Sequence, residues 1–132
     1  MAAAPQPVHL LVRRYGDHRT NPAFGRGATL RTSSTSLVDR LFDLNVGGAL
    51  KTVRAALSRL VEDRGRLVLI SSVFAFVNGA GAIPYAMSKA AVEQLGRGLR
   101  VELAAHGVSV TTACFAVINT DLTRPCSDPN RL

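Results

Sequence analysis

Apolar residues recur at helical spacing in the stretch that follows Ser36. They sit three to five positions apart and continue to about Val61, which predicts one long amphipathic helix. Ser36 and Asp39, three positions later, resemble a capping box and mark the start of this helix. The members of the apolar stripe are Leu37, Leu41, Leu44, Ala49, Val53, Ala56 and Leu60.

The pattern changes to a compact apolar run after Gly65. Residues 66–70 are rich in branched side chains, which is typical of a buried strand. The segment 73–83 contains two glycines and is read as a loop.

A second helix follows this loop. Pro84 fits its first turn, and the helical pattern continues to about Ala105, where Gly107 ends it and leads into a second strand at 108–113. A strand, a helix and a strand in this order predict a right-handed parallel crossover. The expected fold class is therefore α/β, a partial Rossmann-like parallel sheet in the order helix, strand, helix, strand.

Residues 1–36 show no sustained period apart from the short run Val8–Val12. They are rich in Pro, Gly, Ser and Thr and hold five arginines against one acidic residue. We therefore expect an irregular or disordered basic segment at 1–36, followed by one folded portion at 37–132. A basic start is also found in nucleic-acid-binding arms and transit peptides, but three prolines interrupt any amphipathic helix and few aromatic residues interleave. We expect no nucleic-acid partner.

Composition narrows the class of protein. The chain has 132 residues, of which 47% are hydrophobic, enough for one domain with a core. No run reaches the roughly 18 apolar residues of a membrane span, and no apolar stretch follows a basic start as in a secretory signal. The expected location is cytoplasmic.

Cysteines and histidines give no sign of a metal site. Cys114 ends an apolar run and is expected to be a small core residue, and Cys126 lies in a polar tail. The histidines, His9, His18 and His106, show no ligand spacing with each other or with the cysteines, so we expect no metal.

Tyr85 and Lys89 are the strongest candidates for chemistry. Residues four apart on a helix project from the same face, so the ammonium would lie near the phenol. A cation there favours the phenolate and would move the pKa of Tyr85 towards neutral, as general acid–base catalysis requires. Such a pair also occurs by chance on amphipathic helices, where the lysine snorkels.

Two polar residues upstream are candidates to assist. A Ser72 hydroxyl would orient a substrate oxygen beside the phenol, although it is equally placed to cap the end of the strand. Asn45 carries a donor and an acceptor and would anchor a water, although an asparagine within a helix also faces solvent or kinks the helix.

From about Ser36 to Leu122, the chain resembles the short-chain dehydrogenase/reductase family. Four segments match that family in order, and Ser72 precedes Tyr85 by 13 residues, the usual family separation. The segments are Asp43-Leu-Asn45-Val-Gly-Gly, Gly65-Arg-Leu-Val-Leu-Ile-Ser-Ser72, Tyr85-Ala-Met-Ser-Lys89 and Gly107-Val-Ser-Val-Thr-Thr-Ala-Cys114.

The resemblance implies an NAD- or NADP-dependent oxidoreductase that transfers a hydride between nicotinamide and a carbonyl or secondary alcohol. Tyr85 would exchange a proton with the substrate oxygen, and Lys89 would lower the pKa of Tyr85 and bind the nicotinamide ribose. Ser72 would orient the substrate, and Asn45 would hold a relay water. Of the family's cofactor loop, Ile118 and Thr120 match, whereas Phe115-Ala116 replaces Pro-Gly. The implied cofactor-binding residues are Tyr85, Lys89, Ile118 and Thr120.

The chain departs from the family pattern at its beginning. Family members carry a Thr-Gly-x-x-x-Gly-x-Gly turn after a strand, whereas Gly25 and Gly27 follow Asn-Pro-Ala-Phe. A strand ending in Asn-Asn-Ala-Gly, which precedes the family's asparagine helix, also has no match. Two readings stay open: an oxidoreductase, and a catalytically inactive remnant or interaction module. Because a two-stranded sheet leaves one face exposed, we expect a homo-oligomer or association with related chains.

Overall fold

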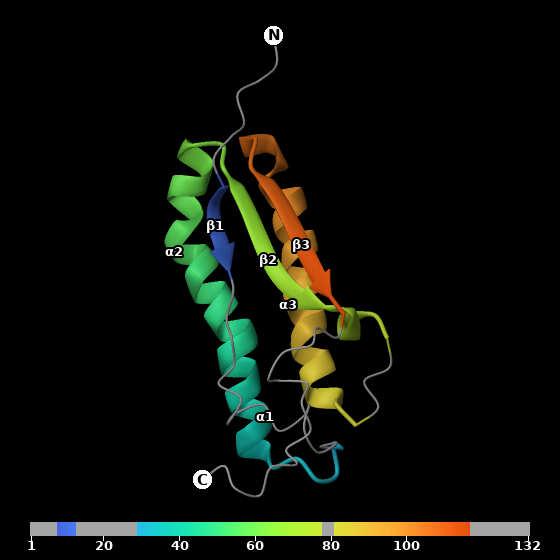
Figure 1. Cartoon of the computed structure of the whole chain (residues 1–132). Helices are drawn as coiled ribbons and strands as arrows, with labels where there is room; N and C mark the ends of the chain where they lie inside the picture. Colours follow the sequence, from blue (N-terminus) through green and yellow to red (C-terminus); the bar gives the residue numbers. More distant parts are fainter. Residues whose placement is uncertain (1–7, 13–28, 78–80, 117–132) are drawn as a thin grey trace, which may run out of the picture.

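The computed structural model of the chain describes residues 8–12, 29–77 and 81–116. Within these residues, three parallel strands form a sheet in the order β1-β2-β3, and helices pack against it (Figure 1). The strands are β1 (Val8–Val12), β2 (Arg66–Ser72) and β3 (Ser109–Phe115). The structure confirms the predicted α/β class and parallel sheet, with β2 running two residues further than expected.

β1 corrects the sequence-based reading of the N-terminal segment. Residues 8–12 were expected to be irregular, but they pair in parallel with β2, with Leu10 opposite Leu67 and Val12 opposite Leu69. A run of only five residues among prolines and arginines carries little local signal for a strand. Its partner, β2, lies more than 50 positions further along the chain, so the pairing is decided by tertiary structure. A strand therefore does precede the helix that bears Asn45.

The first long helix is nearly as predicted but contains an irregular turn. It consists of α1 (Thr35–Phe42), the π-helical turn η1 (Asp43–Gly47) and α2 (Gly48–Glu62). Ser34, not Ser36, caps it, and the Ser34 hydroxyl accepts the backbone N–H of Leu37 at 3.3 Å. A π turn adds one residue to a helical turn and is frequent at functional sites; here it contains Asn45.

The second long helix, α3 (Ile83–Glu102), connects β2 with β3. Pro84 lies in its first turn, as predicted. The helix ends three residues earlier than expected, and a 3-10 turn, η3 (Ala104–His106), follows it. Gly107 then adopts a left-handed backbone with φ of 73°, which glycine reaches without strain.

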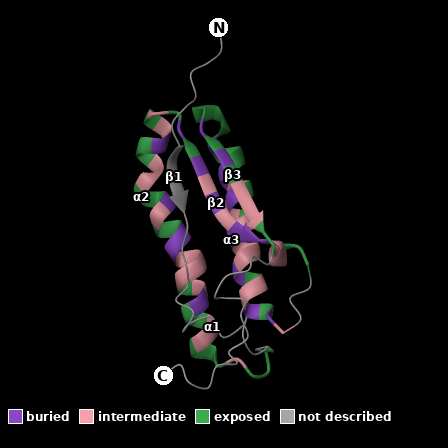
Figure 2. Ribbon diagram, in the orientation of Figure 1, coloured by how far each residue is buried: buried purple, intermediate pink, exposed green. Residues whose placement is uncertain are grey.

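Both long helices share one buried core with the same face of the sheet (Figure 2). That face carries Leu67, Leu69 and Val110. The core also contains residues of α2 and α3 and of the segments on either side of η3: Ala49, Val53, Leu60, Val92, Leu99, Leu103 and Val108. The opposite face of β2 and β3 carries Val68, Ile70, Thr111 and Ala113, none of which is buried. In the described part of the chain, one face of the sheet is thus much better covered than the other.

Candidate active site

Ser72 and Tyr85 meet at the carboxyl edge of the sheet. Ser72 is the last residue of β2 and is buried, and Tyr85 lies in the first turn of α3, half-buried. Their side chains are hydrogen-bonded. The Ser72 hydroxyl also accepts the backbone N–H of Phe74 at 3.3 Å, because Ser72 caps the short 3-10 turn η2 (Val73–Ala75). Ser72 therefore does both things that the sequence suggested: it caps the end of the strand and it contacts Tyr85.

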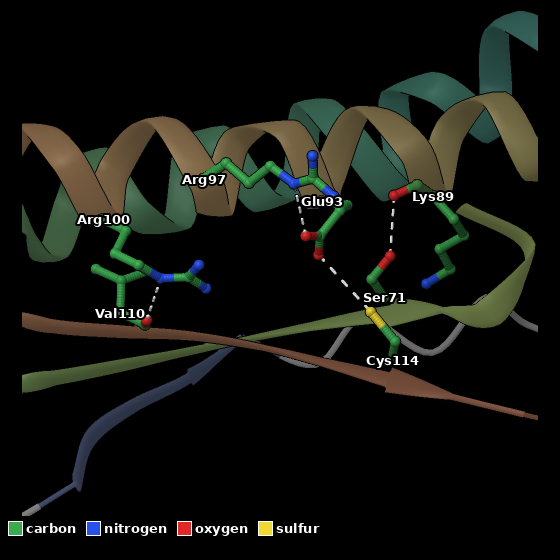
Figure 3. Close-up of polar contacts among 7 residues, drawn as sticks. All are labelled: Ser71, Lys89, Glu93, Arg97, Arg100, Val110 and Cys114. Atoms are coloured by element: carbon green, nitrogen blue, oxygen red, sulfur yellow. Dashed lines mark hydrogen bonds and ion pairs between the residues drawn. The ribbon is translucent and has the colours of Figure 1, made fainter. Parts of the chain in front are cut away.

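Lys89 lies one turn after Tyr85 and is tied to β2 at two points. Its Nζ is 5.6 Å from the centre of the Tyr85 ring and donates to the carbonyl oxygen of Ile70 at 3.5 Å. Its own backbone carbonyl accepts the hydroxyl of Ser71 at 2.9 Å (Figure 3). Three consecutive residues of β2, from Ile70 to Ser72, therefore contact the Tyr-x-x-x-Lys turn of α3.

The pKa of Tyr85 moves in the opposite direction to the sequence-based expectation. Burial raises the pKa of Tyr85 above its ordinary value of 10.0, and the hydrogen bond with Ser72 opposes that rise. Burial lowers the pKa of Lys89, and Cys114 opposes that shift only where its own thiol ionises, at alkaline pH. The ammonium lies over the ring at 5.6 Å from its centre, and desolvation is the largest influence on the pKa of the phenol.

Asn45 reaches the site through a serine that the sequence-based reading missed. Its Nδ2 donates to the hydroxyl of Ser88 at 3.0 Å, and Ser88 donates to the backbone carbonyl of Tyr85 at 2.8 Å. Ser88 is fully buried. The sequence did contain a signal for a buried Ser88, because it lies in the stripe of α3 that recurs every three or four residues. The buried positions of this stripe are Pro84, Ser88, Val92, Gly96 and Leu99. A serine within that stripe needs a polar partner.

Cys114 of β3 faces Glu93 of α3 in a polar cluster rather than in a purely apolar core (Figure 3). Its thiol donates to Oε2 of Glu93 at 3.7 Å, and Oε1 of Glu93 accepts Nε of Arg97 at 3.1 Å (Figure 3). Burial, reinforced by Glu93, raises the pKa of the Cys114 thiol, so the thiol stays protonated and unreactive at neutral pH.

The structure brings together Asn45, Ser72, Tyr85 and Lys89 through these contacts, whereas Ile118, Thr120 and Cys126 lie outside the described residues. Among residues 29–77 and 81–116, no group of three or more His, Cys, Asp or Glu side chains could hold a metal ion. None of the helices described is long and apolar enough to cross a membrane.

Comparison with known proteins agrees with this geometry. The model of the short chain dehydrogenase family matches residues 6–131. An uncharacterized oxidoreductase of Staphylococcus aureus is 35% identical over 94 residues, which are 70% of this chain and 41% of the relative. EphD, a probable oxidoreductase of Mycobacterium bovis, is 35% identical over 104 residues, or 77% of this chain and 18% of the relative.

The fold has close counterparts among solved structures. A short chain dehydrogenase from Burkholderia cenocepacia in complex with NADP superimposes with a TM-score of 0.71 at 26% identity, covering 80% of this chain and 46% of the other. This chain spans less than half the length of each of these three proteins. Because the family match covers almost the whole sequence, including residues 8–12, and the sheet and site follow it, the chain belongs to the short-chain dehydrogenase family.

Proposed function

We propose that this chain carries the catalytic portion of an NAD- or NADP-dependent oxidoreductase that acts on a carbonyl compound or a secondary alcohol. The observation that carries the proposal is the meeting of Ser72, Tyr85 and Lys89 at the carboxyl edge of a parallel sheet, with Nζ of Lys89 5.6 Å from the centre of the Tyr85 ring. Ligands of such sheets bind at that edge. The membership of the family and the oxidoreductase relatives support the same reaction class.

In this proposal, Tyr85 is the acid when a carbonyl is reduced. Because burial raises the pKa of Tyr85, the phenol keeps its proton at neutral pH and has it available for the substrate oxygen. Ser72 lies within hydrogen-bonding reach of the same phenol, so its hydroxyl would hold the substrate oxygen beside Tyr85.

Lys89 would hold the cofactor. An ammonium carries three N–H donors. One of them donates to the carbonyl of Ile70, in a long hydrogen bond of 3.5 Å. Donors at this edge of the sheet fit the hydroxyl groups of a nicotinamide ribose. When bound, the nicotinamide would supply or accept the hydride. Ile118 and Thr120 complete the proposed cofactor-binding set.

Asn45 would hold a water for proton relay. Its Nδ2 is engaged by Ser88, so the amide oxygen at the other end of the group is the candidate acceptor. This bond also fixes the π turn against α3, which keeps Asn45 at a constant distance from the backbone of Tyr85.

A second function, association with copies of itself or with related chains, is favoured by the sheet. Parallel sheets are normally covered on both faces, and here Val68, Ile70, Thr111 and Ala113 on one face of β2 and β3 are not buried. Within the described residues, β1 and β3 each have one neighbouring strand only. In this alternative the chain is an interaction module without catalysis.

Turnover tests the proposal. The purified chain is incubated with NADH or NADPH and a panel of aldehydes and ketones, and oxidation of the nicotinamide is followed by absorbance. Replacing Tyr85 with phenylalanine should reduce the rate by about 100-fold or more, the usual contribution of a general acid. The matched control is Tyr15→Phe, the other tyrosine of the sequence. Equal rates in the parent and Tyr85→Phe would refute Tyr85 as the acid, and the absence of any turnover would favour the interaction module.

A further inference from the structure

Phe74 contacts both Ser72 and Tyr85, through two different groups. Its backbone N–H donates to the hydroxyl of Ser72 at 3.3 Å. Its ring meets the ring of Tyr85 edge to face, with the centroids 6.1 Å apart and the planes at 77°. This is a favoured geometry for two aromatic rings, because the positive edge of one faces the negative face of the other.

The bond from Phe74 holds the oxygen of Ser72 and leaves its proton free to donate. A serine hydroxyl has one proton and two lone pairs. The N–H of Phe74 occupies a lone pair, so the proton stays available for the phenol oxygen of Tyr85. The hydrogen bond from Ser72 lowers the pKa of Tyr85, which is the effect of a donor that stabilises the phenolate. When the phenol is ionised, the donors therefore run from Phe74 through Ser72 to Tyr85, whereas the second lone pair of Ser72 can accept the proton of the neutral phenol.

The ring of Phe74 has a separate effect on Tyr85. It covers part of the phenol and so contributes to the burial of that side chain. Phe76, two positions further on, has a different environment. Its side chain is 57% exposed, and its ring lies 5.6 Å from the guanidinium of Arg97. The two phenylalanines therefore form a natural pair for comparison.

We propose that Phe74 is a positioning residue of this site, whose ring fixes the plane of Tyr85 and whose N–H holds the Ser72 oxygen in place beside it. The inference rests on the proposed function, in which Tyr85 exchanges a proton with the substrate. Phe74 itself acts through these two side chains and takes no part in bond making.

The test measures the pKa of Tyr85 directly and needs no substrate. The sequence contains two tyrosines and no tryptophan, so Tyr15→Phe leaves Tyr85 as the only tyrosine. In that background, Phe74→Leu and the matched control Phe76→Leu are titrated by the ultraviolet absorbance of tyrosinate, with circular dichroism confirming the fold at each pH. Leucine keeps the backbone N–H and removes the ring.

We expect Phe74→Leu to lower the pKa of Tyr85, because burial is the larger influence on that group, and Phe76→Leu to leave the pKa unchanged. An unchanged pKa in Phe74→Leu, or an equal shift in both variants, would overturn the inference.

A second measurement covers the case in which Phe74→Leu does not fold. In the Tyr15→Phe chain, nuclear Overhauser effects should connect the ring protons of Phe74 and Tyr85, and their absence would overturn the inference. A lack of turnover in a chain that shows the pKa shift would count against the proposed function alone, so the two failures are distinguishable.

Discussion

At Tyr85, burial and a hydrogen bond act in opposite directions, and burial is the larger effect. The sequence was sufficient to pair Tyr85 with Lys89, because residues four apart on a helix share a face. It was not sufficient to give the direction of the pKa shift. That direction depends on what covers the phenol, and Phe74 reaches it from a different element.

The raised pKa has a consequence for stability at alkaline pH. The folded chain holds the Tyr85 proton to a higher pH than the unfolded chain, so the stabilisation present below pH 10.0 is lost as the pH rises through the folded-state pKa. Tyr85→Phe has no such loss. We expect the free energy of unfolding of the parent to fall relative to that of Tyr85→Phe above pH 10.0, measured by urea unfolding at several pH values. Parallel curves for the two chains would contradict the burial of the phenol.

Ser88 gives a second prediction for a single residue. Ser88→Ala leaves the Asn45 amide without its acceptor in a partly buried place, and such a loss costs about 1–3 kcal/mol. Urea unfolding measures the loss. The control is Ser58→Ala, at an exposed position of α2, which should change the stability by no more than about 0.5 kcal/mol. Equal effects of the two substitutions would mean that Ser88 does not connect η1 to α3.

For the helices and strands, the spacing of apolar residues predicted the boundaries of those elements whose contacts are local in sequence. The apolar stripe placed the first helix within one or two residues of its ends, and the Gly107 signal placed the start of β3 within one. β1 was missed because its pairing with β2 is non-local. The π turn was missed because a single extra residue barely disturbs the helical period. The contact of Ser71 with α3 was not predicted for a different reason: it is made with a backbone carbonyl, which leaves no trace in the pattern of side chains.

The approach of α3 to the sheet depends on Gly96. A Cβ atom at Gly96 would lie 2.0 Å from Oγ1 of Thr112 and 3.3 Å from Cδ1 of Leu69. Gly96→Ala should therefore lower the free energy of unfolding by about 1–3 kcal/mol, the usual range for overpacking.

Gly98, on the same helix, is the matched control. A Cβ atom there meets nothing within 4 Å, so Gly98→Ala should raise the free energy of unfolding by about 0.5–1 kcal/mol through helix propensity. Thermal or urea unfolding of both variants gives the comparison. Changes of the same sign in the two would contradict the packing of α3 against β2 and β3.

For the whole molecule, the uneven covering of the sheet predicts association. One face of β2 and β3 carries the apolar residues Val68 and Ile70, which are only half-buried. We expect the 14.0 kDa chain to sediment as a dimer or larger species at micromolar concentration. A folded monomer over the whole accessible concentration range would contradict this expectation.

Binding of a nicotinamide cofactor is the measurement that decides whether this chain holds the proposed site. The folded chain is titrated with NADH and with NADPH, followed by nicotinamide fluorescence, with Lys89→Met as the variant that removes the proposed ribose ligand. We predict saturable binding of at least one of the two cofactors, and weaker binding by Lys89→Met. No binding by a demonstrably folded sample at about millimolar cofactor, a concentration at which even weak complexes form, would contradict it.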